Sequence, residues 1–137
     1  MLQMEVPPEE NWKAVSLARA AGARMIPIYL DPEQTRVALV GRGALCVRRL
    51  EWLRKLEAKP VVFSDAPSAA LKEAAGFLLA KRLPEREELR AFQAIWIADI
   101  ETEDARELAA LAREEGVLVN VEDAKPLCSF HTPAIVK

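Results

Sequence analysis

The feature that most constrains the fold is a series of short apolar runs, each followed by a segment with helical spacing. Such runs are typical of strands that are buried on both faces of a parallel sheet. We expect strands at residues 36–40, 60–64, 77–80, 94–98 and 117–121. Strands that alternate with helices imply right-handed crossovers, so the sequence predicts an α/β fold: a doubly wound parallel sheet in three layers, α/β/α.

Helices are expected between these runs, at residues 44–58, 68–75, 84–89 and 102–115. Thr102 is of a type that caps a helix start, and Gly116 is of the type that ends one. The 137 residues suit a single domain, whose core needs neither a disulfide nor a metal. We therefore divide the chain into an N-terminal appendage, residues 1–24, with a helix expected at 9–23, and one domain, residues 25–137.

Composition and charge exclude several classes of protein. The net charge is −2 and the pI is about 5.6, whereas a nucleic-acid binder usually carries a basic face. No apolar run is long enough to span a membrane, and the first residues lack the pattern of a secretory signal. Cys46 and Cys128 match no zinc or disulfide framework, and His131 is the only histidine, so no metal site is expected. A cytoplasmic location is the resulting expectation.

A glycine loop joins the first expected strand to the first expected helix. Residues 41–46 read G-R-G-A-L-C, a G-x-G-x-x-C variant with cysteine where a third small residue is usual. In Rossmann-like dinucleotide-binding domains, Gly41 would allow the tight turn, Gly43 would let the backbone approach a pyrophosphate, and Cys46 would be small enough for close packing. The free N–H groups at the helix start favour phosphate. A plain strand–helix turn is the alternative interpretation, and Cys46 is either a packed or a reactive thiol.

Asp65 follows the second expected strand, 24 residues after Gly41. An acidic residue at this point accepts hydrogen bonds from the adenosine ribose and favours NAD over NADP, because it repels a 2′-phosphate. Asp65 could equally cap the next helix. These two interpretations have equal weight on the sequence alone.

With these motifs, the chain resembles the N-terminal domain of siroheme synthase and the related precorrin-2 dehydrogenases. Residues 25–30, MIPIYL, are similar to the opening "LPIF" strand of that family, and residues 37–49, VALVGRGALCVRR, to its V-x-V-V-G-G-G-x-V-A-x-R-K motif. Residues 120–123, NVED, are similar to N-V-V-D, and residues 127–136, LCSFHTPAIV, to L-C-x-F-x-x-P-A-I-V. The resemblance runs from about Met25 to the C-terminus.

The resemblance implies an NAD-dependent enzyme of siroheme biosynthesis. Members oxidise precorrin-2, a tetrapyrrole, to sirohydrochlorin, and some also act as ferrochelatases. By resemblance, Ala44 and Leu45 contact NAD in the glycine loop, and Asp65 and Ala66 form a second contact. Asp123 matches the catalytic aspartate that removes protons. On position alone, Asp123 would more simply be a turn-forming residue.

The chain also departs from the family pattern. Asp99 stands where many relatives have a small residue, and we expect it to crowd the cofactor. Arg42 replaces the middle glycine of the triple. We expect the dimerisation and helical regions that follow in the family to be absent after Lys137 and the segment after Leu127 to be exposed, and we expect a homodimer to form through that segment.

Three hypotheses follow. The first is an NAD-dependent precorrin-2 dehydrogenase-like enzyme with Asp123 as its acid–base residue. The second is a non-catalytic dinucleotide-binding or interaction module derived from that family. A generic Rossmann protein with another ligand is a weaker third interpretation.

Overall fold

The structure is a computed structural model that describes residues 25–132. The helix predicted at residues 9–23 lies outside the described residues, as do residues 133–137.

The core of the fold is a five-stranded parallel sheet in the order β3-β2-β1-β4-β5. The chain forms β1 (Val37–Gly41) at the centre and then winds outward in both directions, through β2 (Val61–Phe63) and β3 (Leu79–Ala80) on one side. On the other side it forms β4 (Ala94–Ala98) and β5 (Leu118–Val121). All four strand pairings are parallel, which confirms the predicted doubly wound, Rossmann-like α/β fold.

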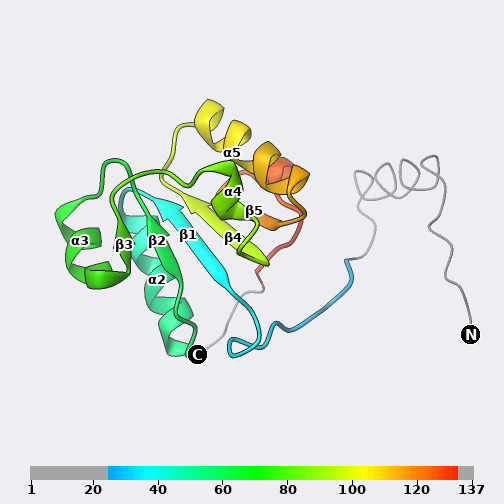
Figure 1. The fold of residues 1–137 in the computed structure, drawn as a ribbon, viewed down its shortest axis with the longest axis horizontal. Coiled ribbons are helices and arrows are strands. Elements are labelled where there is room, and N and C mark those ends of the chain that lie inside the picture. The colour runs from blue at the N-terminus through cyan, green and yellow to red at the C-terminus, as the bar shows by residue number, and fades with distance from the viewer. Residues whose placement is uncertain (1–24, 133–137) are drawn as a thin grey trace, which may run out of the picture.

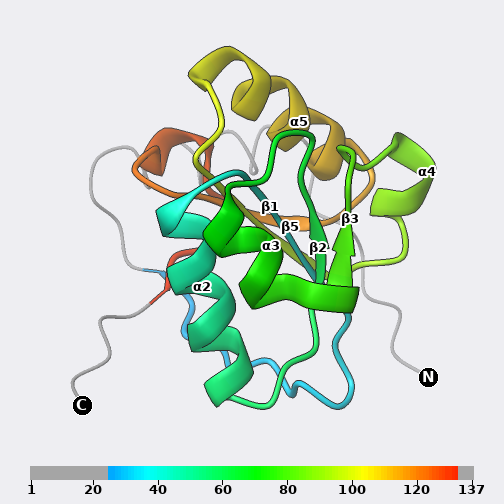
Figure 2. The ribbon, with the colours of Figure 1, turned by 90° about the vertical axis from the view of Figure 1, so that its left-hand side faces the viewer.

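Helices cover both faces of the sheet (Figures 1 and 2). On one face, α2 (Ala44–Lys55) and α3 (Ala69–Ala75) bury Leu50 and Leu71 against the sheet. On the other face, α4 (Arg86–Leu89) and α5 (Thr102–Glu114) bury Leu89 and Leu108. Residues of β1 and β4 alternate between the two cores, because successive side chains of a strand point to opposite faces.

Element boundaries differ from the predictions in places. The third expected strand is short: a 3-10 turn, η1 (Gly76–Leu78), takes its first residues, and Phe77 is 96% exposed rather than in the sheet. The helix α2 ends three residues before the predicted end, because the chain turns at Glu57, which has a φ of 66°. The helix cap before α5 is Glu101, not Thr102, which is the first helical residue.

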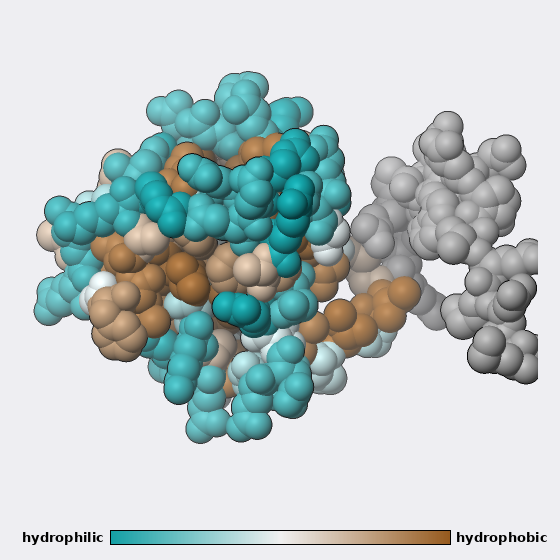
Figure 3. Space-filling view, viewed as in Figure 1, coloured by the Kyte–Doolittle hydropathy of each residue, from teal (hydrophilic) through white to brown (hydrophobic). Residues whose placement is uncertain are grey.

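The expected strand at residues 25–30 is not present. This segment is irregular and exposed, with Tyr29 fully accessible to solvent, and its apolar side chains form the brown arm in Figure 3. The prediction from the family resemblance was wrong here for a physical reason. Pro27 lacks the N–H that a sheet requires, and both sides of β1 are already paired, with β2 and β4.

The segment after Leu127 packs against the sheet. A second 3-10 turn, η2 (Lys125–Leu127), precedes it. The Ser129 N–H donates to the Val119 carbonyl at 2.8 Å, and the Asn120 side-chain amide donates to the Phe130 carbonyl at 3.0 Å. Cys128 is buried, so the expectation that this segment is exposed was wrong as far as Phe130, because it covers the outer edge of β5.

Candidate functional site

The glycine loop lies at the carboxyl end of β1, where ligands bind in open α/β sheets. Gly41 is the last residue of β1 and is paired with Ala98 of β4. A Cβ atom added at Gly41 would lie 2.3 Å from the Ala98 carbonyl oxygen and 2.7 Å from the Cys46 Cβ. Only glycine fits at position 41, because β4 and α2 pack directly against it. The small side chain of Cys46 allows the same close contact.

The start of α2 presents its backbone N–H groups to an anion, and the anion is a side chain of the protein. One carboxylate oxygen of Asp99, Oδ2, accepts from the Gly43 N–H at 3.1 Å and from the Cys46 N–H at 2.9 Å. Gly43 is the N-cap of α2, and no side chain of α2 caps it. Asp99 therefore occupies N–H groups that a cofactor phosphate would use, and the expectation that it crowds the cofactor stays a prediction.

The predicted cofactor residue Asp65 forms an ion pair with Arg42 of the glycine loop. Arg42 Nε donates to Asp65 Oδ1 and Arg42 Nη2 donates to Asp65 Oδ2, both at 2.8 Å. This bidentate bond lowers the pKa of the Asp65 carboxyl and raises that of Arg42. Asp65 does not cap α3, because Ser68 does so through its hydroxyl, which accepts from the Leu71 N–H. The Arg42 carbonyl in turn accepts from the Ser68 N–H, which ties the glycine loop to the start of α3.

Asp123 follows β5 in an exposed turn and has a φ of 62°. It lies in a hollow of about 350 Å³ together with Asn120, Lys125 and His131. The register places this hollow at the same edge as the glycine loop, because Gly41 pairs with Ala98 and Val121 pairs with Ile97 one residue earlier in β4. The turn geometry fits both interpretations of Asp123, as a turn residue and as a catalytic carboxylate.

The remaining predicted cofactor residues lie around these. Ala44 and Leu45 occupy the first turn of α2, with Ala44 exposed and Leu45 half-buried, and Ala66 is exposed beside Asp65. Cys46 is fully buried. Burial, together with the Asp99 carboxylate, raises the pKa of the Cys46 thiol to about 12, so the interpretation of Cys46 as a packed residue holds.

An ion pair connects the glycine-loop helix to the Asp123 edge. Arg49 of α2 lies 2.7 Å from Glu122, which immediately precedes Asp123, and the Arg49 guanidinium also stacks over Trp52 at 4.7 Å. Trp52 meets Trp96 edge-on, and Trp96 meets Phe130 in the same way. The two tryptophans therefore pack against each other and join α2 to the segment that covers β5.

Two of these contacts were not predicted from the sequence: the pairing of Arg42 with Asp65 and that of Arg49 with Glu122. The first pairing could have been inferred, because Arg42 and Asp65 each follow the end of one of two expected strands, and neighbouring parallel strands bring such residues together. The second crosses from the second turn of α2 to the end of β5, and nothing in the spacing indicates it.

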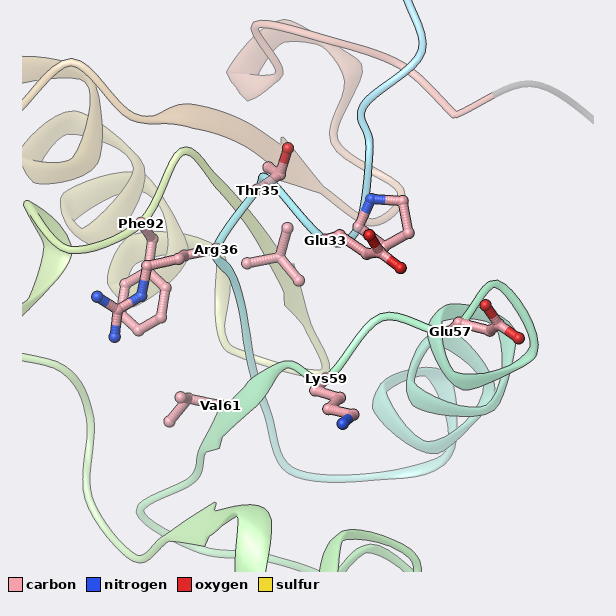
Figure 4. Close-up of a pocket in the computed structure, with 9 residues that line it drawn as sticks. Glu33, Thr35, Arg36, Glu57, Lys59, Val61 and Phe92 are labelled. Atoms are coloured by element: carbon pink, nitrogen blue, oxygen red, sulfur yellow. The ribbon is translucent and has the colours of Figure 1, made fainter.

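A second hollow, of about 410 Å³, lies at the opposite edge, where the strands begin (Figure 4). Glu33, Arg36, Glu57 and Lys59 bring charges of both signs to it. It is far along the sheet from the glycine loop, so it forms no part of the candidate site. Among residues 25–132, no group of three or more His, Cys, Asp and Glu side chains could hold a metal, and no helix there is long and apolar enough to cross a membrane.

Comparisons with known proteins show which proteins this chain is similar to. Residues 28–134 match the family described as "Putative NAD(P)-binding". Siroheme synthase of Pseudoalteromonas atlantica is 32% identical over 115 residues, and that of Nitrosococcus oceani is 30% identical over 114 residues. These alignments cover 80% and 81% of this chain, but the chain spans only 24% of either relative.

A solved structure shares the fold. The structure named "SirC, precorrin-2 dehydrogenase" superposes with a TM-score of 0.58 at 21% identity. The match covers 80% of this chain and 55% of that one.

Proposed function

The chain belongs to the NAD(P)-binding domain family of siroheme synthases and precorrin-2 dehydrogenases, and on that premise we propose that it is an NAD-dependent precorrin-2 dehydrogenase-like protein of siroheme biosynthesis. The proposed reaction is the oxidation of precorrin-2 to sirohydrochlorin. The proposal includes ferrochelatase activity, in which ferrous iron is a substrate and Asp123 serves a second time.

One observation carries the proposal: the Asp123 carboxylate and the glycine loop share the carboxyl edge of one sheet. The N–H groups of Gly43 and Cys46 already hold a carboxylate oxygen, so their geometry suits an anionic group such as pyrophosphate. Asp65 follows β2, the neighbour of β1, where the adenosine ribose would lie. The residues present therefore fit a dinucleotide once the Asp99 carboxylate has left these two N–H groups.

The chemistry divides between the cofactor and this chain. NAD, when bound, accepts the hydride that leaves the substrate. Oxidation by loss of two hydrogens also releases a proton, and the exposed Asp123 carboxylate is placed to accept it. The hollow around Asp123, with Lys125 and His131, would take the edge of the tetrapyrrole, whose acidic side chains suit Lys125.

The test is Asp123→Asn. Asparagine tolerates the positive φ of this position and keeps the size of the side chain, so the fold should persist. We expect loss of precorrin-2 turnover by a factor of about 100 or more, with NAD affinity unchanged. Asp104→Asn, an exposed change of the same chemistry in the first turn of α5, is the matched control and should keep both. Equal turnover in wild type and Asp123→Asn would contradict the role of Asp123.

The second candidate is a non-catalytic dinucleotide-binding or interaction module. The occupied N–H groups at Gly43 and Cys46, and the Arg42–Asp65 pair, favour it, because both contacts use groups that a cofactor would need. Such a module shows no precorrin-2 turnover in the wild type, so the same assay separates the two candidates.

Binding should be measured first, by calorimetry with NAD⁺ and NADH and with NADP⁺ as comparison. Gly43→Asp is the negative variant, because a side chain at Gly43 would point at the Asp99 carboxyl group, 3.4 Å away. If no dinucleotide binds to the wild type or to the Asp99 variants described below, the dehydrogenase proposal fails. The homodimer, the tetrapyrrole partner and the cytoplasmic location remain predictions.

A further inference from the structure

The anion site of the glycine loop is filled by the protein itself. The Oδ2 atom of Asp99 accepts from two N–H groups of the turn that begins α2, at 3.1 and 2.9 Å. These are the groups that face a pyrophosphate in dinucleotide-binding domains. A ligand phosphate and the Asp99 carboxylate therefore require the same two donors.

The backbone fixes Asp99 in this position. Asp99 directly follows β4, whose last residue, Ala98, pairs with Gly41. Its φ is 58°, in the left-handed region that aspartate tolerates better than most residues. The atoms nearest to the missing Cβ of Gly43 are Oδ2, Cγ and Cβ of Asp99, at 3.4 to 3.8 Å. The open side of the second glycine, where a cofactor would approach, is thus the side that Asp99 occupies.

We propose that Asp99 is an affinity-determining residue of the dinucleotide site, an internal anion that the pyrophosphate of NAD(P) must displace before it binds. This inference rests on the proposed function, because it assumes that the glycine loop takes a dinucleotide. Two anions so close repel each other and cannot share two donors. The apparent affinity is therefore the intrinsic affinity multiplied by the fraction of molecules in which Asp99 has left the loop.

Competition with Asp99 should distinguish ligands that carry a phosphate from ligands that do not. Only a phosphate competes with Asp99 for the N–H groups of Gly43 and Cys46. ADP and NAD⁺ should therefore bind more tightly when the Asp99 carboxylate is removed, whereas adenosine, which carries no phosphate, should not.

The experiment compares wild type with Asp99→Gly and Asp99→Asn. Glycine removes the carboxylate and accepts a φ of 58° without strain, and asparagine keeps the shape but removes the charge. Calorimetry with NAD⁺, ADP and adenosine measures affinity. The ¹H–¹⁵N resonances of Gly43 and Cys46 report whether phosphate reaches their N–H groups. We expect Asp99→Gly to bind NAD⁺ and ADP about tenfold more tightly or better, and Asp99→Asn to lie between.

Asp104→Asn is the matched control, because the charge of Asp104 also acts on Arg42 of the loop, whereas the N–H groups of Gly43 and Cys46 bond to Asp99 instead. It should leave the affinities within about twofold of wild type. Thermal unfolding of each variant checks that the fold is retained, since Asp99→Gly also removes the hydrogen bonds that cap α2.

Three outcomes are distinguishable. A gain in Asp99→Gly that is limited to the phosphate-bearing ligands supports the inference. Equal binding by wild type and Asp99→Gly, with shifted Gly43 and Cys46 resonances, overturns the inference and leaves the proposed function standing. No binding of NAD⁺ or ADP to any variant overturns the dinucleotide site, and the inference with it.

Discussion

At the scale of single residues, the two loop glycines differ sharply in what surrounds them. A methyl group at Gly41 would overlap the Ala98 carbonyl, whereas one at Gly43 would meet the Asp99 carboxylate at an ordinary 3.4 Å. We expect Gly41→Ala to lower the free energy of unfolding by about 3 kcal/mol and Gly43→Ala by less than about 1 kcal/mol. Urea unfolding of the two variants measures this, and equal losses would contradict the packing role of Gly41.

The Arg42–Asp65 pair bears on the choice between NAD and NADP. While Arg42 neutralises Asp65, the carboxylate repels a 2′-phosphate less than a free aspartate would. We expect Arg42→Ala to raise the ratio of NAD⁺ to NADP⁺ affinity about tenfold. Arg48→Ala, which removes an equal charge from an exposed position of α2, is the control. Calorimetry with both cofactors measures the ratio. The same change in both variants would mean that general charge, rather than this pair, sets the preference.

The buried Cys46 thiol should make the stability of the folded protein depend on pH. The pKa of its thiol is raised from 9.0 to about 12 in the folded state, so the folded protein holds this proton more tightly than the unfolded chain does. Its contribution to stability is complete below pH 9 and is lost as the pH rises from about 9 towards 12. The loss of stability between pH 8 and 10.5 in urea unfolding should be smaller in Cys46→Ala than in wild type. Parallel pH profiles would refute this assignment.

At the scale of elements, most of the fold follows from local pattern. The buried apolar runs of β1, β4 and β5 are long enough to be recognised as strands from the sequence, and Gly41 marks the turn into α2. The pattern failed where an apolar side chain does not enter the sheet: Phe77 is exposed in a 3-10 turn, and residues 25–30 are exposed beside a sheet whose central positions are filled. Apolar character alone does not distinguish these cases.

The site was predictable to a lesser extent. Gly41, Gly43, Asp65 and Asp123 each follow an expected strand, and the structure has all four at the carboxyl edge of the sheet. Their roles in binding and catalysis stay predictions. The partners were not found, because an ion pair depends on which strands are neighbours and on side-chain direction. Asp99 was expected to crowd the cofactor, but its bonds to two N–H groups require the left-handed backbone that only the structure shows.

The link between α2 and β5 gives a prediction at this scale. Arg49 and Glu122 are both less than one-fifth exposed, and their bond joins two elements that are far apart in sequence. We expect a coupling energy of about 1 kcal/mol in a double-mutant cycle of Arg49→Ala and Glu122→Ala, measured by urea unfolding. The exposed pair Arg82–Glu88 is the reference and should couple less. A coupling near zero would show that the pair does not hold α2 to the Asp123 edge.

At the scale of the whole molecule, the sheet is closed at the β5 edge by the segment that follows the candidate catalytic turn. The Ser129 hydroxyl accepts from the Val119 N–H at 2.7 Å, and the Ser129 N–H donates to the Val119 carbonyl at 2.8 Å. An uncovered strand edge would offer these groups to a second chain. The packing of this segment therefore affects both stability and self-association.

Ser129→Pro tests that connection, because proline removes both the N–H and the hydroxyl that bond Val119. We expect a loss of about 2 to 3 kcal/mol in unfolding free energy, and a rise in self-association by light scattering at equal concentration. Ser129→Ala keeps the N–H bond and should lose about 1 kcal/mol without added association. If the predicted homodimer forms through the region after Leu127, Ser129→Pro should instead dissociate it. The direction of the light-scattering change therefore decides whether this segment shields the sheet edge or joins two chains.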